Sequence, residues 1–173
     1  MNHDRHRVNR TCFAAARTAL HRLSADNPHL IPAGPIPTAG RSDDRLVRYG
    51  YRDYRELFNP RQLLHLGVLA DAIQDVEGLP GEALQIAFSD HLTTNNMLCG
   101  YIGGWRRLSP LFAIRAYRHI ARPVEINPWL QHNGRGTFPN AVRAIRRASA
   151  SLRQHAEPTL HGRLRAVPPR QAR

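Results

Sequence analysis

The sequence predicts a mainly α-helical fold, an irregular helical domain with Gly- and Pro-rich connections. Three observations support this prediction: apolar residues recur at helical spacing, good helix caps precede such stretches, and no strand pattern alternates with a helix as in a βαβ unit. The chain has 173 residues, the size of one domain with short tails. A domain of about 150 residues buries roughly 70% of its unfolded surface, so a hydrophobic core is expected without disulfides or metals.

The cysteine content and the hydropathy of the chain indicate a reduced, soluble protein. Cys12 and Cys99 are too few for a disulfide framework or, alone, for a four-ligand zinc site, so plain thiols in a reducing cytoplasm are expected. No apolar run approaches the roughly 20 residues that span a bilayer. The polar N-terminus lacks the apolar stretch of a signal peptide. The sequence therefore predicts a cytoplasmic protein with no membrane partner.

Residues 1–44 are expected to form an N-terminal helix followed by a Pro-rich linker. The polar residues 1–10 are predicted to be frayed, and residues 11–24 to form the helix. Residues 27–40 hold four Pro and two Gly, which is typical of a linker or of an extended segment that crosses the domain. The apolar side of the helix is expected to consist of Phe13, Leu20 and Leu23.

The most regular part of the sequence predicts an antiparallel pair of helices. Asn59 is a favourable N-cap and Pro60 fits the first helical turn, so a helix is predicted over 60–77. The Gly78–Pro80 stretch is expected to end this helix, and a second helix is predicted over 81–94. The residues expected to face inward are Leu63, Leu66, Leu69, Ala70, Ile73 and Val76 on the first helix, and Leu84, Ala87, Phe88, His91 and Leu92 on the second.

The remainder of this helical domain, which spans 45–156, is expected to be less regular. Residues 97–104 are too rich in Gly for a long helix, 109–121 are predicted to form a short helix, and 124–130 to be extended. A last helix is predicted over 138–155. Its expected cap is Thr137, and the residues expected to face inward are Val142, Ile145, Ala148 and Leu152.

Positive charge is concentrated in the C-terminal part of the chain. The formal net charge is +12, and all 25 basic residues are Arg. Residues 1–48 carry 8 Arg and 4 acids, 49–105 carry 3 Arg and 7 acids, and 106–173 carry 14 Arg and 2 acids. Within the last range, residues 157–173 have no periodicity and predict a disordered basic tail. This distribution indicates a polyanion partner, and the DNA phosphate backbone is the expected one.

Five arginines are the candidate nucleic-acid contacts. They are Arg106, Arg107, Arg143, Arg146 and Arg147. Interleaved with Trp105, Tyr117 and Phe138, they are suited to holding phosphates and stacking bases. An equally weighted alternative is a solvated Arg-rich surface produced by codon bias in a GC-rich genome.

Other patterns with chemical potential favour structural interpretations. Asp90-His91 resembles the start of the metal motif of His-Asn-His nucleases, but a helix is predicted instead of the required hairpin, which favours a locally hydrogen-bonded pair. The glycines of 100–104 and 134–136 are compatible with phosphate loops, although tight turns are favoured because neither stretch follows a clear strand. An anion at the helix start over Thr137–Asn140 stays open. No spacing of His, Cys and acids predicts a metal site.

Five strings in the centre of the chain carry a family resemblance. They are Tyr49-Gly50-Tyr51 with Tyr54 to Leu64, Phe88-Ser89-Asp90, Asn95-Asn96, Val124 to Trp129, and Gly134 to Val142. In this order they resemble the central region of bacterial adenine-specific DNA methylases that contain a zinc ribbon and the domain of unknown function 1156. The resemblance covers roughly residues 45–148. The motif residues are Asn59, Pro60, Arg61, Gln62, Asp90, Asn95, Asn96, Glu125, Asn127, Pro128, Trp129, Gly134, Gly136, Thr137, Phe138, Pro139 and Asn140.

The resemblance implies the central module of an α/β methyltransferase, without its Rossmann-like core. The family uses S-adenosylmethionine, with a Gly-rich cofactor motif and the zinc ribbon N-terminal to this region and an Asp-Pro-Pro-Tyr catalytic block C-terminal to it. This sequence shows no such motif, and Asn127-Pro128-Trp129 lacks the second Pro of that block. No catalytic, cofactor-binding or metal-binding residue is therefore assigned. S-adenosylmethionine is expected only in a complete methyltransferase.

The resemblance thus implies a fragment or split module of an adenine-specific DNA methyltransferase, inactive by itself. Its expected task is to hold DNA or to brace a catalytic methyltransferase domain or subunit, and an apolar face is expected where that domain packs. A function of another class stays open, that of a stand-alone nucleic-acid-binding protein with no catalytic partner. A third is an enzyme with a site assembled from distant residues, which binding of S-adenosylmethionine by this chain alone would reveal.

Overall fold

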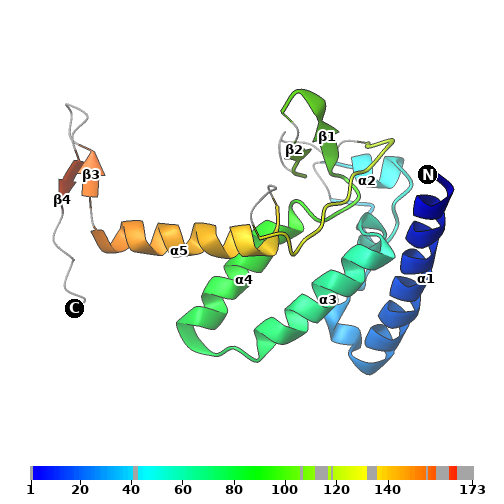
Figure 1. Ribbon diagram of the computed structural model, residues 1–173, viewed down its shortest axis with the longest axis horizontal. Helices are drawn as coiled ribbons and strands as arrows, with labels where there is room; N and C mark the ends of the chain where they lie inside the picture. The colour runs from blue at the N-terminus through cyan, green and yellow to red at the C-terminus, as the bar shows by residue number, and fades with distance from the viewer. Residues whose placement is uncertain are drawn as a thin grey trace.

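The fold is mainly α, an irregular helical domain in which two small two-stranded sheets are the only sheets of the described residues. The computed structural model describes residues 2–40, 43–105, 107–111, 117, 119–131, 136–154, 156–158 and 164–166. Within them the predicted absence of a Rossmann-like core is confirmed. In Figure 1, α1, α3 and α4 gather on one side and α5 projects away from them. No helix of the described part is long and apolar enough to cross a membrane.

Helix α1 (Asn2–Asp26) is longer than the sequence predicts. Residues 1–10 are predicted to be frayed, and from Asn2 onward this prediction is wrong. These residues include neither Gly nor Pro, so no helix-breaking residue interrupts the helix near its N-terminus. Helix α1 packs against α3 (Pro60–Gln74). The two approach closely at Gly67, where an added Cβ would lie 2.7 Å from a methyl of Leu23. Gly at this position therefore sets the distance between the two helices.

The Pro-rich segment 27–40 crosses the domain, the second of its two predicted forms. It contains the 3-10 helix η1 (Pro28–Leu30) and buries Ile31 and Ile36. The Ile36 amide donates to the Arg52 carbonyl at 2.8 Å, which ties the segment to the chain before the next 3-10 helix. The short helix α2 (Arg45–Arg48) and η2 (Tyr54–Leu57) complete this layer. The buried cluster that results consists of Ile36, Leu46, Leu57 and Leu98.

Helices α3 and α4 (Gly78–Leu92) form the predicted antiparallel pair, with different boundaries. The predicted start of α3 is confirmed. The Asn59 side chain accepts hydrogen bonds from the Arg61 and Gln62 amides, and the Asn59 amide donates to Gln62 Oε1, which completes a capping box. The predicted end at 77 and the predicted start at 81 are wrong. Pro80 lies in the first turn of α4, where the missing N–H breaks no helical hydrogen bond. The connection between α3 and α4 therefore comes three residues earlier than predicted.

A β-hairpin follows the helix pair. Strands β1 (Gly100–Ile102) and β2 (Arg107–Ser109) are antiparallel and enclose η3 (Gly103–Trp105), with Tyr101 opposite Leu108. The helix predicted over 109–121 is wrong for its described residues. Ser109 ends a strand, and the Leu111 amide donates to the Thr93 carbonyl at 2.8 Å, so the chain is held by α4 instead of turning into a helix. Residues 112–116 and 118 lie outside the described part.

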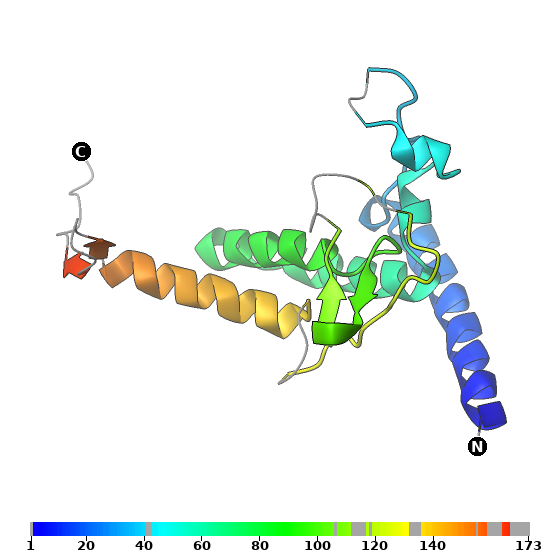
Figure 2. The same ribbon diagram turned by 90° about the horizontal axis from the view of Figure 1, so that it is seen from above.

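Helix α5 (Phe138–Gln154) matches its predicted range within one residue. Val142 and Ile145 are half-buried against α4, but Ala148 is exposed, so the inward stripe predicted for this helix ends after two turns. The reason is that the second half of α5 leaves the domain, as Figures 1 and 2 both show. The Leu152 side chain lies outside the described part. Strands β3 (Ala156–Pro158) and β4 (Leu164–Ala166) form an antiparallel pair where an aperiodic tail is predicted.

Candidate functional site

Four of the five strings of the family resemblance are joined to another string by hydrogen bonds. The motif residues come from the start of α3, the last turn of α4 and the turn after it, an extended segment, and the start of α5. The described members are Asn59–Gln62, Asp90, Asn95 and Asn96, Glu125, Asn127–Trp129, and Gly136–Asn140. Gly134 lies outside the described part. The Phe138 amide donates to the Pro128 carbonyl at 2.9 Å, which joins two of the strings directly.

Glu125 connects the extended segment to the start of α3. Its Oε2 accepts from Asn59 Nδ2 at 3.0 Å and from Arg61 Nη2 at 2.7 Å. The Arg61 guanidinium also lies over the ring of Phe13 on α1, 5.3 Å from its centroid. Both partners of the ion pair are about a third exposed, so the contact adds positioning more than stability.

Two histidines from neighbouring helices form the centre of the site. His65 Nε2 on α3 lies 2.7 Å from His91 Nε2 on α4, and His91 is fully buried. His65 packs edge-on against Trp129, with 4.8 Å between ring centroids, and His91 packs against Phe138 at 5.7 Å. Sequence reasoning missed this pair. Its one local signal is that His91 occupies a predicted inward position of its helix.

Burial keeps both histidines neutral at pH 7. Burial, and then the charge of His91, lowers the pKa of His65 to about 4. Burial also lowers the pKa of His91 to about 4, although the Gly136 carbonyl acts in the opposite direction. At 2.7 Å there is room for one proton between the two Nε2 atoms, so one ring donates a hydrogen bond to the other. Two protonated rings would both place a proton there, which excludes the doubly charged pair in this geometry. His65 Nδ1 is buried and has no hydrogen-bond partner in the described part.

Asn95 joins the histidine pair to the turn before α5. Its Nδ2 donates to the Gly136 carbonyl at 2.9 Å and to the His91 carbonyl at 2.8 Å, and lies 3.0 Å from His91 Nδ1. Thr94 Oγ1 lies 3.3 Å from the same Gly136 oxygen. Gly136 has a φ of +91°, and an added Cβ would lie 2.4 Å from Thr94 Oγ1, so a residue without a side chain is required. We call His65, His91, Thr94, Asn95 and Gly136 the polar joint.

The hydrogen bonds of the polar joint run between described groups of the chain itself. Asp90 is exposed while His91 is buried, and the described residues include no group of three His, Cys, Asp or Glu placed to hold a metal. The nuclease interpretation of Asp90-His91 therefore has no support in the geometry. The Gly136 carbonyl is engaged by Asn95, as in the tight-turn interpretation of 134–136. The Thr137 carbonyl accepts the first helical bonds of α5 from the Asn140 and Ala141 amides, but its buried hydroxyl has no described partner, so the predicted cap by this side chain is not formed.

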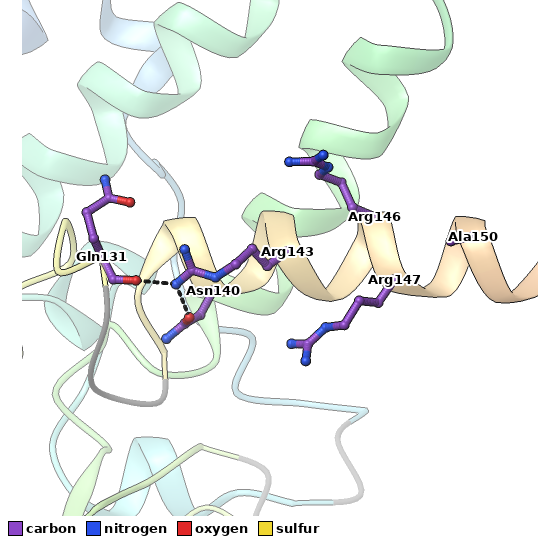
Figure 3. Close-up of a pocket in the computed structure, with 6 residues that line it drawn as sticks. All are labelled: Gln131, Asn140, Arg143, Arg146, Arg147 and Ala150. Atoms are coloured by element: carbon purple, nitrogen blue, oxygen red, sulfur yellow. Dashed lines mark hydrogen bonds between the residues drawn. The ribbon is translucent and has the colours of Figure 1, made fainter.

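Three of the five candidate arginines meet along α5. Arg143, Arg146 and Arg147 line a hollow of about 670 Å³, together with Gln131, Asn140 and Ala150 (Figure 3). The Arg143 guanidinium donates to the Gln131 carbonyl and to Asn140 Oδ1, which fixes it at the mouth of the hollow. Arg146 and Arg147 are exposed and form no ion pair with another described residue. We call Arg143, Arg146 and Arg147 the arginine face.

The other predicted nucleic-acid contacts do not join the arginine face. Arg107 is half-buried on β2 and does not line the hollow, and Arg106 lies outside the described part. Phe138 packs on His91 and Tyr117 packs against the buried cluster, and both are half-buried, so their stacking role stays a prediction. The side chain of Trp105 is outside the described part. The exposed aromatic ring near α5 is instead Trp129, at 50% exposure.

A search of protein-family models, curated proteins and solved structures finds no match for this chain.

Proposed function

We propose that this chain holds DNA for an adenine-specific methyltransferase that uses S-adenosylmethionine, and that it supplies no catalytic residue. The observation that carries the proposal is the arginine face. Its three residues are spaced i, i+3 and i+4 and therefore share one side of the helix. Helix α5 has no acid in its sequence, so its charge is left for an external anion.

Charge and shape both favour a nucleic acid as that anion. Arg146 and Arg147 lie on a helix that projects from the domain, where the backbone of a large partner has access to them. Contacts of this kind to phosphates supply affinity without sequence information. Binding by this face is therefore expected to depend strongly on salt and weakly on DNA sequence.

The family resemblance supports the methyltransferase part of the proposal. Four of its five strings are joined by hydrogen bonds, as expected if they belong to one folded unit. In this proposal S-adenosylmethionine binds elsewhere in the complete enzyme, and the catalytic domain or subunit is a partner of this chain in the cytoplasm. A stand-alone nucleic-acid-binding protein would use the same face without such a partner.

The test is a titration of fluorescently labelled duplex DNA with the full chain at low salt. The R146E/R147E variant is expected to weaken binding at least ten-fold. The matched control is R17E/R22E, which changes the net charge equally through two exposed arginines of α1. Equal loss in both variants would show a general charge effect and contradict the assignment to α5. Absence of duplex binding by the unaltered chain would contradict the proposal as a whole.

Calorimetry with S-adenosylmethionine tests the non-catalytic part. The chain alone is expected to give no binding heat and no methyl transfer to DNA. Saturable binding would place the cofactor site in this chain and would overturn this part of the proposal.

A further inference from the structure

Trp129 is a large aromatic side chain that lies half-exposed in the chain segment leading to the arginine face. One residue separates it from Gln131, which lines the hollow and whose carbonyl accepts a bond from Arg143. Its neighbour Leu130 is 42% exposed. Large exposed apolar side chains often mark a binding site. The positive charge of the arginine face favours a negatively charged partner.

Two hydrogen bonds hold the backbone at Trp129. The Trp129 amide donates to Asn127 Oδ1 at 3.0 Å, and the preceding Pro128 carbonyl accepts from the Phe138 amide at 2.9 Å. His65 supports the indole from the domain side at 4.8 Å between ring centroids, with the rings perpendicular. The exposed part of the indole is therefore presented in a fixed orientation, which lowers the conformational entropy lost on binding.

A fixed aromatic surface together with unneutralised arginines fits unpaired nucleotides. In single-stranded nucleic acids the bases are free to stack on aromatic side chains while the backbone follows a positive groove. In a duplex the bases are already stacked, and only the phosphates are accessible to such a surface. We infer that Trp129 stacks an unpaired DNA base while Arg146 and Arg147 contact the adjoining phosphates. This inference rests on the proposed DNA contact of the arginine face and adds a preference for single-stranded regions.

The experiment compares single-stranded and duplex oligonucleotides of equal length, at one salt concentration, by the anisotropy of labelled DNA. Trp129→Ala is expected to weaken single-strand binding about 5- to 150-fold and to leave duplex binding within about two-fold. Tyr101→Ala is the matched control, because Tyr101 is an exposed aromatic residue on β1 and is 56% exposed. This control is expected to change neither affinity.

Two further variants separate stacking from folding. Trp129→Leu keeps an apolar side chain over His65 without a π face, and Trp129→Phe keeps the π face. The inference predicts that the Phe variant binds single strands at least five-fold more tightly than the Leu variant, with equal thermal unfolding midpoints. Equal single-strand affinity of these two variants would overturn it.

The outcomes also distinguish the inference from the proposed function. If R146E/R147E weakens duplex binding while every Trp129 variant leaves single-strand binding unchanged, the arginine face binds DNA and the stacking inference is wrong. If the unaltered chain binds neither DNA, both fail. The emission of Trp129 is read in a Trp105→Phe variant, because the chain has two Trp. If it shifts to shorter wavelength when this protein is concentrated and not when DNA is added, the exposed indole serves a protein interface, which also overturns the inference.

Discussion

The polar joint and the arginine face differ in how their polar groups are satisfied. In the polar joint, His91 and Asn95 are buried and bonded to groups of the same chain. In the arginine face, Arg146 and Arg147 are exposed and have no anion among the described residues. Apart from His65 Nδ1, which has no described partner, the polar joint is satisfied within the fold, whereas no described residue neutralises Arg146 or Arg147.

This difference separates residues that hold the fold from residues that act on a partner. Most motif residues of the family resemblance belong to the first kind, because they cap helices, pair with Glu125 or join the turn before α5. In the proposed function, the arginines of α5, which follow the last string, belong to the second kind. Residues that mark a family resemblance can therefore hold the fold while other residues contact the partner. Substitutions in the two regions are therefore expected to have separate effects on stability and on DNA binding.

The largest effect is expected in the polar joint, from Asn95→Ala. This change removes the donor to the buried Gly136 and His91 carbonyls and leaves both without that bond. The free energy of unfolding is expected to fall by about 3 kcal/mol in urea denaturation. Gln85→Ala, an exposed change on α4, is the control and should stay within about 0.5 kcal/mol. Equal stability of the two variants would mean that the joint does not hold the fold.

The next effect compares two glycines with similar backbone angles. Gly136 has a φ of +91° and Gly50 a φ of +98°, but only Gly136 would place a Cβ against Thr94. Gly50→Ala is expected to lower the free energy of unfolding by about 1 kcal/mol through its backbone alone. Gly136→Ala should cost about 1 kcal/mol more because of the added steric overlap. Equal costs, measured by the same denaturation, would contradict the close contact of Gly136 with Thr94.

The histidine pair predicts a fall in stability at acid pH. The folded pKa values of His65 and His91 are about 4, below the usual 6.5, so the unfolded chain binds protons that the folded chain does not. Above pH 6.5 both states are neutral at these rings and the pair adds no pH dependence. Between pH 6.5 and about 4 the free energy of unfolding falls, by about 3 kcal/mol for His91, and below pH 4 this contribution levels off.

Denaturation midpoints measured from pH 7 to pH 4 check this prediction. His65→Gln is the comparison, because it removes one titrating ring and keeps a polar side chain. The variant should lose less stability than the unaltered chain over this range, whatever its stability at pH 7. Parallel curves would show that the pair does not titrate as its burial requires.

The smallest effect is expected at the ion pair of Arg61 and Glu125. Glu125→Gln should lower the free energy of unfolding by about 1 kcal/mol, because the pair is partly buried and Asn59 shares the carboxylate. Asp44→Asn is the matched control, since the pair of Asp44 with Arg48 is 3.7 Å long and well exposed. Its change should not be measurable. A larger effect at Asp44 would reverse this ranking.

The sequence predicts best those features that local spacing determines. The capping box at Asn59 and Gln62 lies within four residues, and its helix begins where it is predicted to begin. The Gly78–Pro80 stretch shows the limit of local signals, because Gly and Pro are found both after the end of a helix and at its start. The close approach of Gly81 to the Val76 carbonyl belongs to the start of α4, and no local pattern indicates it.

The candidate site is harder to predict because distant residues build it. His65 and His91 are 26 positions apart on different helices, and neither has a metal-site spacing that would mark it. The exposure of Trp129 and the burial of Phe138 depend on how the extended segment meets α5. By contrast, the grouping of Arg143, Arg146 and Arg147 follows from helical periodicity alone, and this part of the site was accessible from sequence.

The dependence of duplex binding on salt tests most directly whether the arginine face contacts phosphates. Each neutralised phosphate contributes about −0.9 to the slope of log K against log salt concentration. The account predicts that Arg146→Ala/Arg147→Ala reduces the magnitude of this slope by about 2 relative to the unaltered chain, with an unchanged thermal unfolding midpoint. An identical slope in the variant and the unaltered chain would contradict it.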